Sequence, residues 1–171
     1  KQVIAQETGV LQENPEYRKS VVVVVYNPKE KKYLSLNWGS LGGNLFIGGG
    51  VNEGEDLVTT AIREIKEETG YSNLKYISKT GTIFHSYFAH SKSSARKIEA
   101  TGLLFELVDE LQGDKTLEDD EKDKFTLEWL SENDILSKIN DELHSLVFVK
   151  VTSGSELYIG EGVLVDSKEC N

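Results

Sequence analysis

The chain has 171 residues, 38% of them hydrophobic, which suits one compact domain and includes no stretch of about 18 apolar residues that would span a membrane. Its net charge of −10 argues against a general electrostatic hold on DNA or other nucleic acid, which needs clustered lysine and arginine. The single cysteine, Cys170, excludes an internal disulfide and a cysteine-based zinc site, and it fits a reducing, cytoplasmic compartment.

The sequence contains no methionine and runs from Lys1 to Asn171. We interpret it as a segment of a longer polypeptide that carries a single domain over residues 1–171. The expected core covers about residues 20–150. Residues 1–19 form an N-terminal arm, and residues 151–171 form an extended C-terminal segment that can be the flanking sequence of a larger protein.

The first half of the chain predicts strands around one helix. Residues 21–26 are mostly β-branched and predict a buried strand, residues 33–38 alternate as a second strand, and residues 45–47 form a short strand between glycines. A helix follows, with one apolar stripe at helical spacing and a stop at Thr69 and Gly70. The stripe consists of Leu57, Val58, Ala61, Ile62 and Ile65. Further strands are predicted at residues 74–77, 82–89, 101–108 and 125–130, with the Ser- and Lys-rich segment 90–97 as a hairpin loop.

A second helix is predicted to start at Ser131 and to run to about Ile139, with Asp134 completing a variant of the capping box. Residues 146–151 and 157–165 look extended. Strands, one helix, more strands and a second helix together predict an α+β fold, with a mixed β-sheet in an α/β/α sandwich. The glycines at 48–50 have the wrong spacing for a dinucleotide fingerprint or a P-loop.

Three glutamates lie close together where the first helix should end. In the segment REIKEETGY, residues 63–71, Glu64 is a helical neighbour of both Glu67 and Glu68, and each like-charge pair costs roughly 0.2–0.5 kcal/mol. The three side chains also lie at the negative end of the helix dipole. Both effects are unfavourable, so the cluster calls for an explanation.

The direction of Glu68 supplies that explanation. At about 100° per residue, Glu68 projects between Leu57 and Ala61, inside the apolar stripe of the helix. A solvated acidic face paired with Arg63 and Lys66 is the common alternative for a glutamate-rich helix, but it does not account for a carboxylate directed at packed surface. A hard divalent cation held by several oxygens would reverse each penalty. The residues alone therefore favour a metal site.

The spacing around these glutamates resembles the signature of the Nudix hydrolases. Its fixed positions are filled by Gly49, by Glu55 after five further residues, and by residues 63–71 after seven more. The likeness extends loosely over about residues 20–140. By this resemblance, the metal ligands are Glu64, Glu67, Glu68 and the backbone carbonyl at Gly49 or its neighbour. It also implies that Glu55, Arg63 and Gly70 support the site.

The resemblance implies Mg²⁺- or Mn²⁺-dependent hydrolysis of a nucleoside diphosphate linked to another moiety. A diphosphate has crowded negative charge, which such cations neutralise while they help to deprotonate the attacking water. Members of that family often take a further acidic residue from a loop before a late strand that bears tryptophan. Residues 118–123 precede Trp129 here, and we choose Glu121, with a merely solvated loop as the alternative. The expected catalytic residues are Glu67, Glu121 and Arg63.

Two questions stay open at the level of sequence. Trp38, Phe46 and Phe84 are candidates for stacking on a base, with core packing as the alternative. Residues 158–167 resemble the segment that closes the inserted editing region of some leucyl-tRNA synthetases. This allows a Nudix-fold module with a binding or positioning role, for which tRNA would be a partner. Otherwise we expect a small nucleotide substrate. An interaction domain with solvated glutamates is the third alternative.

Overall fold

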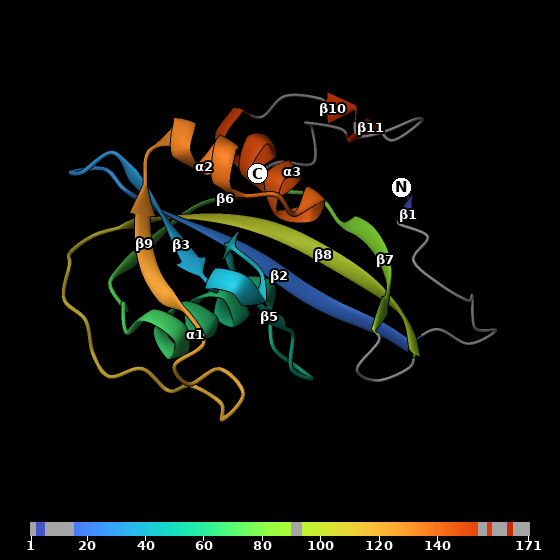
Figure 1. Ribbon diagram of the computed structural model, residues 1–171, viewed down its shortest axis with the longest axis horizontal. Coiled ribbons are helices and arrows are strands. Elements are labelled where there is room, and N and C mark those ends of the chain that lie inside the picture. Colours follow the sequence, from blue (N-terminus) through green and yellow to red (C-terminus); the bar gives the residue numbers. More distant parts are fainter. Residues whose placement is uncertain (1–2, 6–15, 90–93, 154–156, 159–163, 166–171) are drawn as a thin grey trace.

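The computed structural model describes residues 3–5, 16–89, 94–153, 157–158 and 164–165 (Figure 1). Its strands are β1 (Val3–Ala5), β2 (Glu16–Asn27), β3 (Lys32–Asn37), β4 (Asn44–Leu45), β5 (Ile47–Gly50), β6 (Leu74–Lys79), β7 (Ile83–Ala89), β8 (Ser94–Leu107), β9 (Thr126–Leu130), β10 (Leu157–Tyr158) and β11 (Leu164–Val165). Its helices are α1 (Leu57–Thr69), α2 (Glu132–Lys138) and α3 (Glu142–Ser153), with a 3-10 turn at Gly39–Leu41. Within these ranges, every helix is too short or too polar to cross a lipid bilayer.

In the described part of the chain, nine strands form one mixed sheet with the main order β1-β7-β8-β2-β3-β4. Strand β5 pairs with β2, β6 with β8, and β9 with β3. The pairs β2–β8 and β1–β7 are parallel, whereas the other pairs of this sheet are antiparallel. The predicted α+β fold with a mixed sheet is confirmed.

Helices cover both faces of the sheet (Figure 1). Helix α1 packs on one face, where Val21, Val23 and Val25 of β2 belong to its hydrophobic cluster. Helices α2 and α3 cover the other face, where Val22 and Val24 point. Because side chains alternate along a strand, a run of valines places apolar surface on both sides of the sheet at once. The predicted buried strand is confirmed, although β2 begins earlier, at Glu16.

Helix α1 has the predicted extent, and both of its ends are capped. The side chain of Asp56 accepts a hydrogen bond from the backbone N–H of Thr59, which satisfies one of the free donors of the first turn. Ala61 and Ile65 are fully buried against the sheet. The helix ends at Gly70, whose φ of 80° is the left-handed conformation that glycine adopts without strain.

The prediction that residues 146–151 are extended is wrong, because they lie within α3. Their β-branched and aromatic content favours a strand locally, but tertiary packing overrides that preference. At the helix start, Asp141 Oδ1 accepts a hydrogen bond from the backbone N–H of His144 at 2.9 Å. Val147 packs so closely on Gly102 of β8 that a Cβ there would lie 2.5 Å from the valine. The absent side chain on β8 thus makes room for the helix.

Two strand predictions also need correction. The predicted strand 45–47 is interrupted at Phe46, and the glycines at 48–50 belong to β5, which pairs with β2. Strand β8 begins at Ser94 and not at residue 101, because its early residues find partners on β2 and β7. Residues 90–93 and most of the tail that resembles a synthetase segment lie outside the described residues, so the domain boundaries stay a prediction.

Candidate functional site

A cleft of about 560 Å³ opens beside the C-terminal half of α1. It lies where β5, α1 and the acidic segment 118–123 meet. Of the five sequence-predicted glutamates, it contains Glu64, Glu67, Glu68 and Glu121, whereas Glu55 lies outside its lining. Its lining residues are Trp38, Gly48, Gly49, Asn52, Arg63, Glu64, Glu67, Glu68, Glu118, Asp120 and Glu121. Another cavity of about 480 Å³, at the N-terminal end of α1, has two lysines and three carboxylates on its wall, and it contains none of Glu64, Glu67, Glu68 and Glu121. The cleft is therefore the candidate site.

Glu68 is buried at the floor of this cluster, with 4% of its surface exposed. Its Oε2 atom is buried and, within the described residues, has no hydrogen-bond partner. Burial, followed by the charges of Glu64 and Glu121, raises the pKa of Glu68 to about 9. Burial also raises the pKa of Glu64 to about 7, although Arg63 opposes this shift. The ionised cluster is thus unfavourable unless a cation compensates it.

Strand β5 runs directly against one of these carboxylates. A Cβ atom on Gly49 would lie 2.1 Å from both Cδ and Oε1 of Glu64, much closer than two such atoms can approach. The neighbouring Gly50 has open space at the same place. Only a glycine at position 49 therefore allows the backbone of β5 to approach the glutamate.

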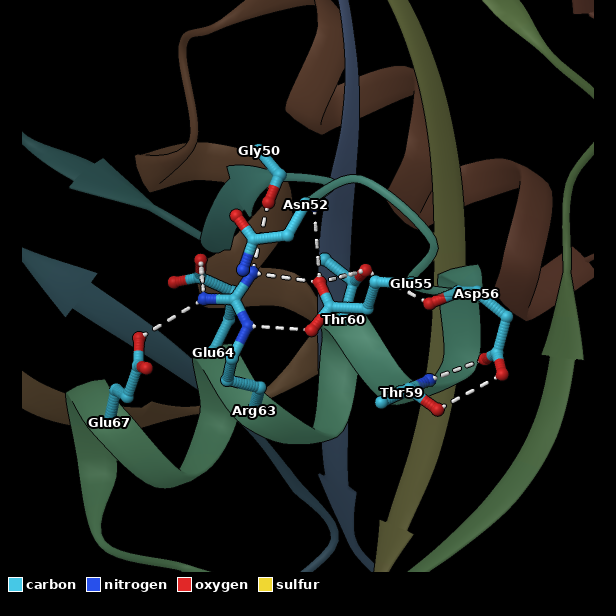
Figure 2. Close-up of polar contacts among 9 residues, drawn as sticks. All are labelled: Gly50, Asn52, Glu55, Asp56, Thr59, Thr60, Arg63, Glu64 and Glu67. Atoms are coloured by element: carbon cyan, nitrogen blue, oxygen red, sulfur yellow. Dashed lines mark hydrogen bonds and ion pairs between the residues drawn. The ribbon is translucent and has the colours of Figure 1, made fainter.

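Arg63 joins the helix to the loop that precedes it (Figure 2). Its Nε and Nη2 atoms donate hydrogen bonds to both carboxylate oxygens of Glu55, at 2.9 and 3.0 Å. Nη2 also donates to the backbone carbonyl of Gly50 at 3.0 Å. Nη1 donates to Glu64 at 2.9 Å and to Glu67 at 3.3 Å. One guanidinium thus positions two glutamates of the cluster and the end of β5.

Glu55 is the partner that holds the guanidinium of Arg63 in place. Hydrogen bonds from Arg63 and then Thr60 lower the pKa of the Glu55 carboxyl to about 2, so it stays ionised as the acceptor. The Thr60 hydroxyl lies 2.6 Å from Glu55 Oε1, and Thr60 itself is fully buried (Figure 2). Sequence reasoning missed Thr60. It lies one turn ahead of Glu64 on the same helix face, so helical spacing would have found it.

The acidic segment reaches the cleft because the chain before it is attached to the end of α1. The backbone N–H of Thr116 donates to the carbonyl of Glu67 at 2.8 Å, and that of Gly113 donates to the carbonyl of Gly70 at 2.8 Å. The side chain of Gln112 donates to the carbonyl of Thr69 at 2.9 Å. These bonds satisfy carbonyls that the last turn of a helix leaves free. We call residues 112–116 the strap.

Beyond the strap, Glu121 meets the glutamates of the helix. Glu121 contributes to the raised pKa of Glu68 through its side chain and its charge, and its charge also raises the pKa of Glu64. Its Oε1 accepts a hydrogen bond from the backbone N–H of Glu118 at 3.1 Å, which holds the turn of the segment. The structure therefore brings the chosen acidic residue to the cluster, whereas its role stays a prediction.

The residues of the cleft fit a hard divalent cation. Most side chains that line the cleft are carboxylates, the ligands that Mg²⁺ and Mn²⁺ prefer, and the buried Oε2 of Glu68 has no hydrogen-bond partner among the described residues. In the described ranges, no three acidic or histidine side chains stand at the spacing of a closed ligand shell. Glu64 and Glu67 bind Arg63 instead, so holding a cation would require these side chains to turn toward Glu68.

Of the predicted aromatic candidates, Phe46 belongs to the core, with 2% of its surface exposed. Its backbone N–H donates to Nδ1 of His144 at 3.0 Å, and the two rings are parallel, with centroids 6.2 Å apart. Sequence reasoning missed His144, which is almost 100 residues away and gives no local signal. Trp38 lines the cleft, whereas Phe84 is absent from its lining.

Comparison with known proteins places the chain in a family. The model of the NUDIX domain matches residues 16–149. An RNA pyrophosphohydrolase of Caulobacter vibrioides is 34% identical over 76 residues, which cover 40% of this chain and 41% of that protein. An ADP-ribose pyrophosphatase of Saccharomyces cerevisiae is 57% identical over 35 residues, which cover 20% of this chain and 15% of that protein. The chain spans less than half the length of the curated relatives it matches.

Solved structures show the same fold. The E. coli dihydroneopterin triphosphate pyrophosphohydrolase superposes with a TM-score of 0.60 at 20% identity, over 82% of this chain and 99% of that one. A binary complex of the C. elegans Ap4A hydrolase superposes with a TM-score of 0.57 at 21% identity, over 80% and 96% of the two chains. At this identity, the likeness concerns the architecture alone.

Proposed function

Because the chain belongs to the NUDIX domain family, we propose that it is a metal-dependent hydrolase of a nucleoside diphosphate linked to another moiety. One observation supports this most directly. Glu68 lies beside Glu64, Glu67 and Glu121 and has a buried oxygen with no hydrogen-bond partner in the part of the chain that the structure describes. This arrangement is costly without a cation and favourable with one. We propose that the reaction takes place in the cytoplasm, in keeping with the single cysteine.

In this proposal, Glu64, Glu68 and the backbone carbonyl at Gly49 hold Mg²⁺ or Mn²⁺, and Glu67 completes the ligand set. When bound, the metal supplies neutralisation of the diphosphate and a lowered pKa for the attacking water. Arg63 orients Glu64 and Glu67, because it hydrogen-bonds with both of them. It acts by positioning, together with Glu55 and the glycine stop of α1.

The reaction is the addition of water across a phosphoanhydride. The water oxygen forms a bond to one phosphorus, the bridging P–O bond breaks, and the second phosphate departs with the bridging oxygen. A carboxylate of the cleft accepts the proton of the water. Glu121 and Glu67 are the candidates. Glu121 comes from a separate segment, whereas the side chain of Glu67 is about one-third exposed and bonded to Arg63.

The names of the relatives support the class of substrate. An RNA pyrophosphohydrolase and an ADP-ribose pyrophosphatase are named for substrates with different organic parts and a shared phosphoanhydride. We therefore propose that the carboxylates, through the metal that they hold, act on the phosphoanhydride of the substrate. The organic part is recognised by other residues of the cleft.

A panel of substrates tests this proposal. It contains ADP-ribose, dinucleoside polyphosphates, sugar nucleotides, oxidised nucleotides and a short RNA with a 5′-triphosphate, each with Mg²⁺, with Mn²⁺ and with a chelator. We expect metal-dependent release of phosphate products from at least one member. Glu68→Gln should lower the rate about 100-fold or more, since it removes a charge-stabilising group.

Glu53→Gln is the matched control, because Glu53 is an exposed glutamate outside the lining of the cleft. It should keep the wild-type rate. Metal binding without turnover of any member would refute the hydrolase proposal. That outcome would favour the module with a binding or positioning role that the tail of the sequence suggests.

A further inference from the structure

The cleft contains one side chain that suits an uncharged, flat group. Most of its described lining side chains are carboxylates, and its one cation, Arg63, already bonds with Glu55, Glu64 and Glu67. Trp38 is the one aromatic or aliphatic side chain of that lining. A substrate whose phosphates are neutralised by cations would find its apolar contact there.

Trp38 is held in place by the turn that follows β3. Its backbone N–H donates to the carbonyl of Gly43 at 2.8 Å, and its carbonyl accepts from the N–H of Leu41 at 3.1 Å. Gly39 and Gly43 close the turn with φ values of 57° and 67°, which glycine adopts without strain. The backbone that bears the indole is therefore fixed before any ligand arrives, which lowers the entropy cost of binding.

The ring of Phe125 packs against the indole of Trp38. The two ring centroids lie 4.8 Å apart, with an angle of 51° between the rings. Phe125 comes two residues after the end of the acidic segment that contains Glu121, and the ammonium group of Lys115 lies 5.9 Å from its ring centroid. Trp38 is only half-buried, so it presents surface to the cleft as well as to Phe125.

We propose that Trp38 is the specificity-determining residue that stacks on the nucleobase of the substrate. This rests on the proposed function, which it deepens by assigning the recognition of the organic part to one side chain. An aromatic side chain stacks on any base, because each base has a π-face. By that reasoning Trp38 selects substrates with a base over diphosphates without one, and it selects weakly among bases.

Steady-state kinetics test this assignment with the best nucleotide of the panel and with its abasic analogue, in which a hydrogen replaces the base. Trp38→Ala should raise KM for the nucleotide roughly 5- to 150-fold, the range found when a stacking aromatic is truncated, and leave kcat within about threefold. Trp38→Phe should restore most of the affinity. KM for the abasic analogue should not change in either variant.

Leu41→Ala is the matched control, because Leu41 lies on the same turn, is 66% exposed and is absent from the lining of the cleft. It should behave as wild type with both substrates. An equal loss on the nucleotide and on the abasic analogue, or an unchanged KM in Trp38→Ala, would overturn the assignment. Circular dichroism of each variant confirms that it is folded.

A binding measurement separates this inference from the proposed hydrolysis. The chain has two tryptophans, so Trp129→Phe leaves Trp38 as the one fluorescent indole. A nucleotide with a methylene group in place of the bridging oxygen should quench its emission, and the abasic counterpart should not. Quenching in a protein that hydrolyses nothing would uphold the stacking role and refute the hydrolase. Turnover without quenching would support the hydrolase and refute the stacking role of Trp38.

Discussion

A methyl group on Gly49 would lie 2.1 Å from the carboxyl carbon of Glu64, so strand β5 and this glutamate occupy adjoining space with no room for a side chain. The contact joins the two parts of the chain that the proposed metal site requires, a backbone carbonyl and a carboxylate. It also makes position 49 a sensitive probe of the site.

Gly49→Ala should displace Glu64 and lower the rate of hydrolysis by about two orders of magnitude, with about 10- to 100-fold weaker binding of Mn²⁺. Calorimetric titration with Mn²⁺ and initial rates measure the two effects. Gly50→Ala is the control, since a Cβ on Gly50 meets open space. Equal behaviour of the two variants would contradict the importance of this contact.

The raised pKa values of Glu64 and Glu68 predict how stability depends on pH without metal. Both values lie above the ordinary 4.5, at about 7 and about 9, so the protonated carboxyls contribute stability that is complete below pH 4.5. This contribution is lost as pH rises through 7 and then 9. Between pH 6 and 9.5, the melting temperature of the metal-free protein should fall, and Glu68→Gln should reduce the fall.

The same groups make metal binding depend on pH, because a cation displaces the protons. Between pH 7 and 9, mainly Glu68 is protonated. The apparent affinity for Mn²⁺ should therefore rise about tenfold per pH unit in this range. Titrations at several pH values measure the slope. An affinity that does not change with pH would show that the ion binds away from Glu68.

His144 holds the corner between β4 and β5 through the backbone N–H of Phe46. Burial lowers the pKa of the His144 imidazole, which keeps Nδ1 available as an acceptor. His144→Ala would leave the amide without its partner, at a cost of about 1–3 kcal/mol in the free energy of unfolding. Urea unfolding measures this cost. His144→Asn retains a nearby acceptor and should recover part of the lost stability. An unchanged free energy of unfolding in His144→Ala would show that the hydrogen bond from Phe46 to His144 does not stabilise this corner.

A substitution at Gly70 tests whether the strap positions the acidic segment. A Cβ on Gly70 would lie 2.2 Å from the carbonyl oxygen of Gly113, and its φ of 80° is strained for any other residue. Gly70→Ala should cost more than the 1–2 kcal/mol that a left-handed residue costs alone, and it should slow hydrolysis by displacing Glu121. Gly54→Ala is the control, because Gly54 has a φ of 76° and open space around its Cβ. A similar loss in both variants would mean that backbone strain alone is responsible.

Local signals account for what the sequence predicts well. The span of α1 follows from its apolar spacing and its stop at Gly70, both within one stretch of chain, and the structure adds a cap at Asp56. The burial of Glu68 follows from its angular position on that helix. These features need no knowledge of distant residues, and the structure agrees with them.

Distant contacts account for what the sequence does not predict. The segment 146–151 has strand-forming residues but folds as part of α3, because the sheet offers it a face with room at Gly102. Gln112 and His144 contribute to the site region through bonds to residues 43 and 98 positions away. Trp38 looks like a core residue by type, and only the arrangement of β3 and the acidic segment places it at the cleft.

The strap fixes the acidic segment by main-chain bonds that end at Thr116, and the chain rejoins the sheet at β9. Whatever lies between these two fixed points can change in length or composition without loosening the helix that bears Glu68. With Glu121 kept, the other positions from 117 to 124 are therefore a natural place for combinatorial libraries. Directed evolution there would change which leaving groups the proposed hydrolase accepts while the scaffold stays the same.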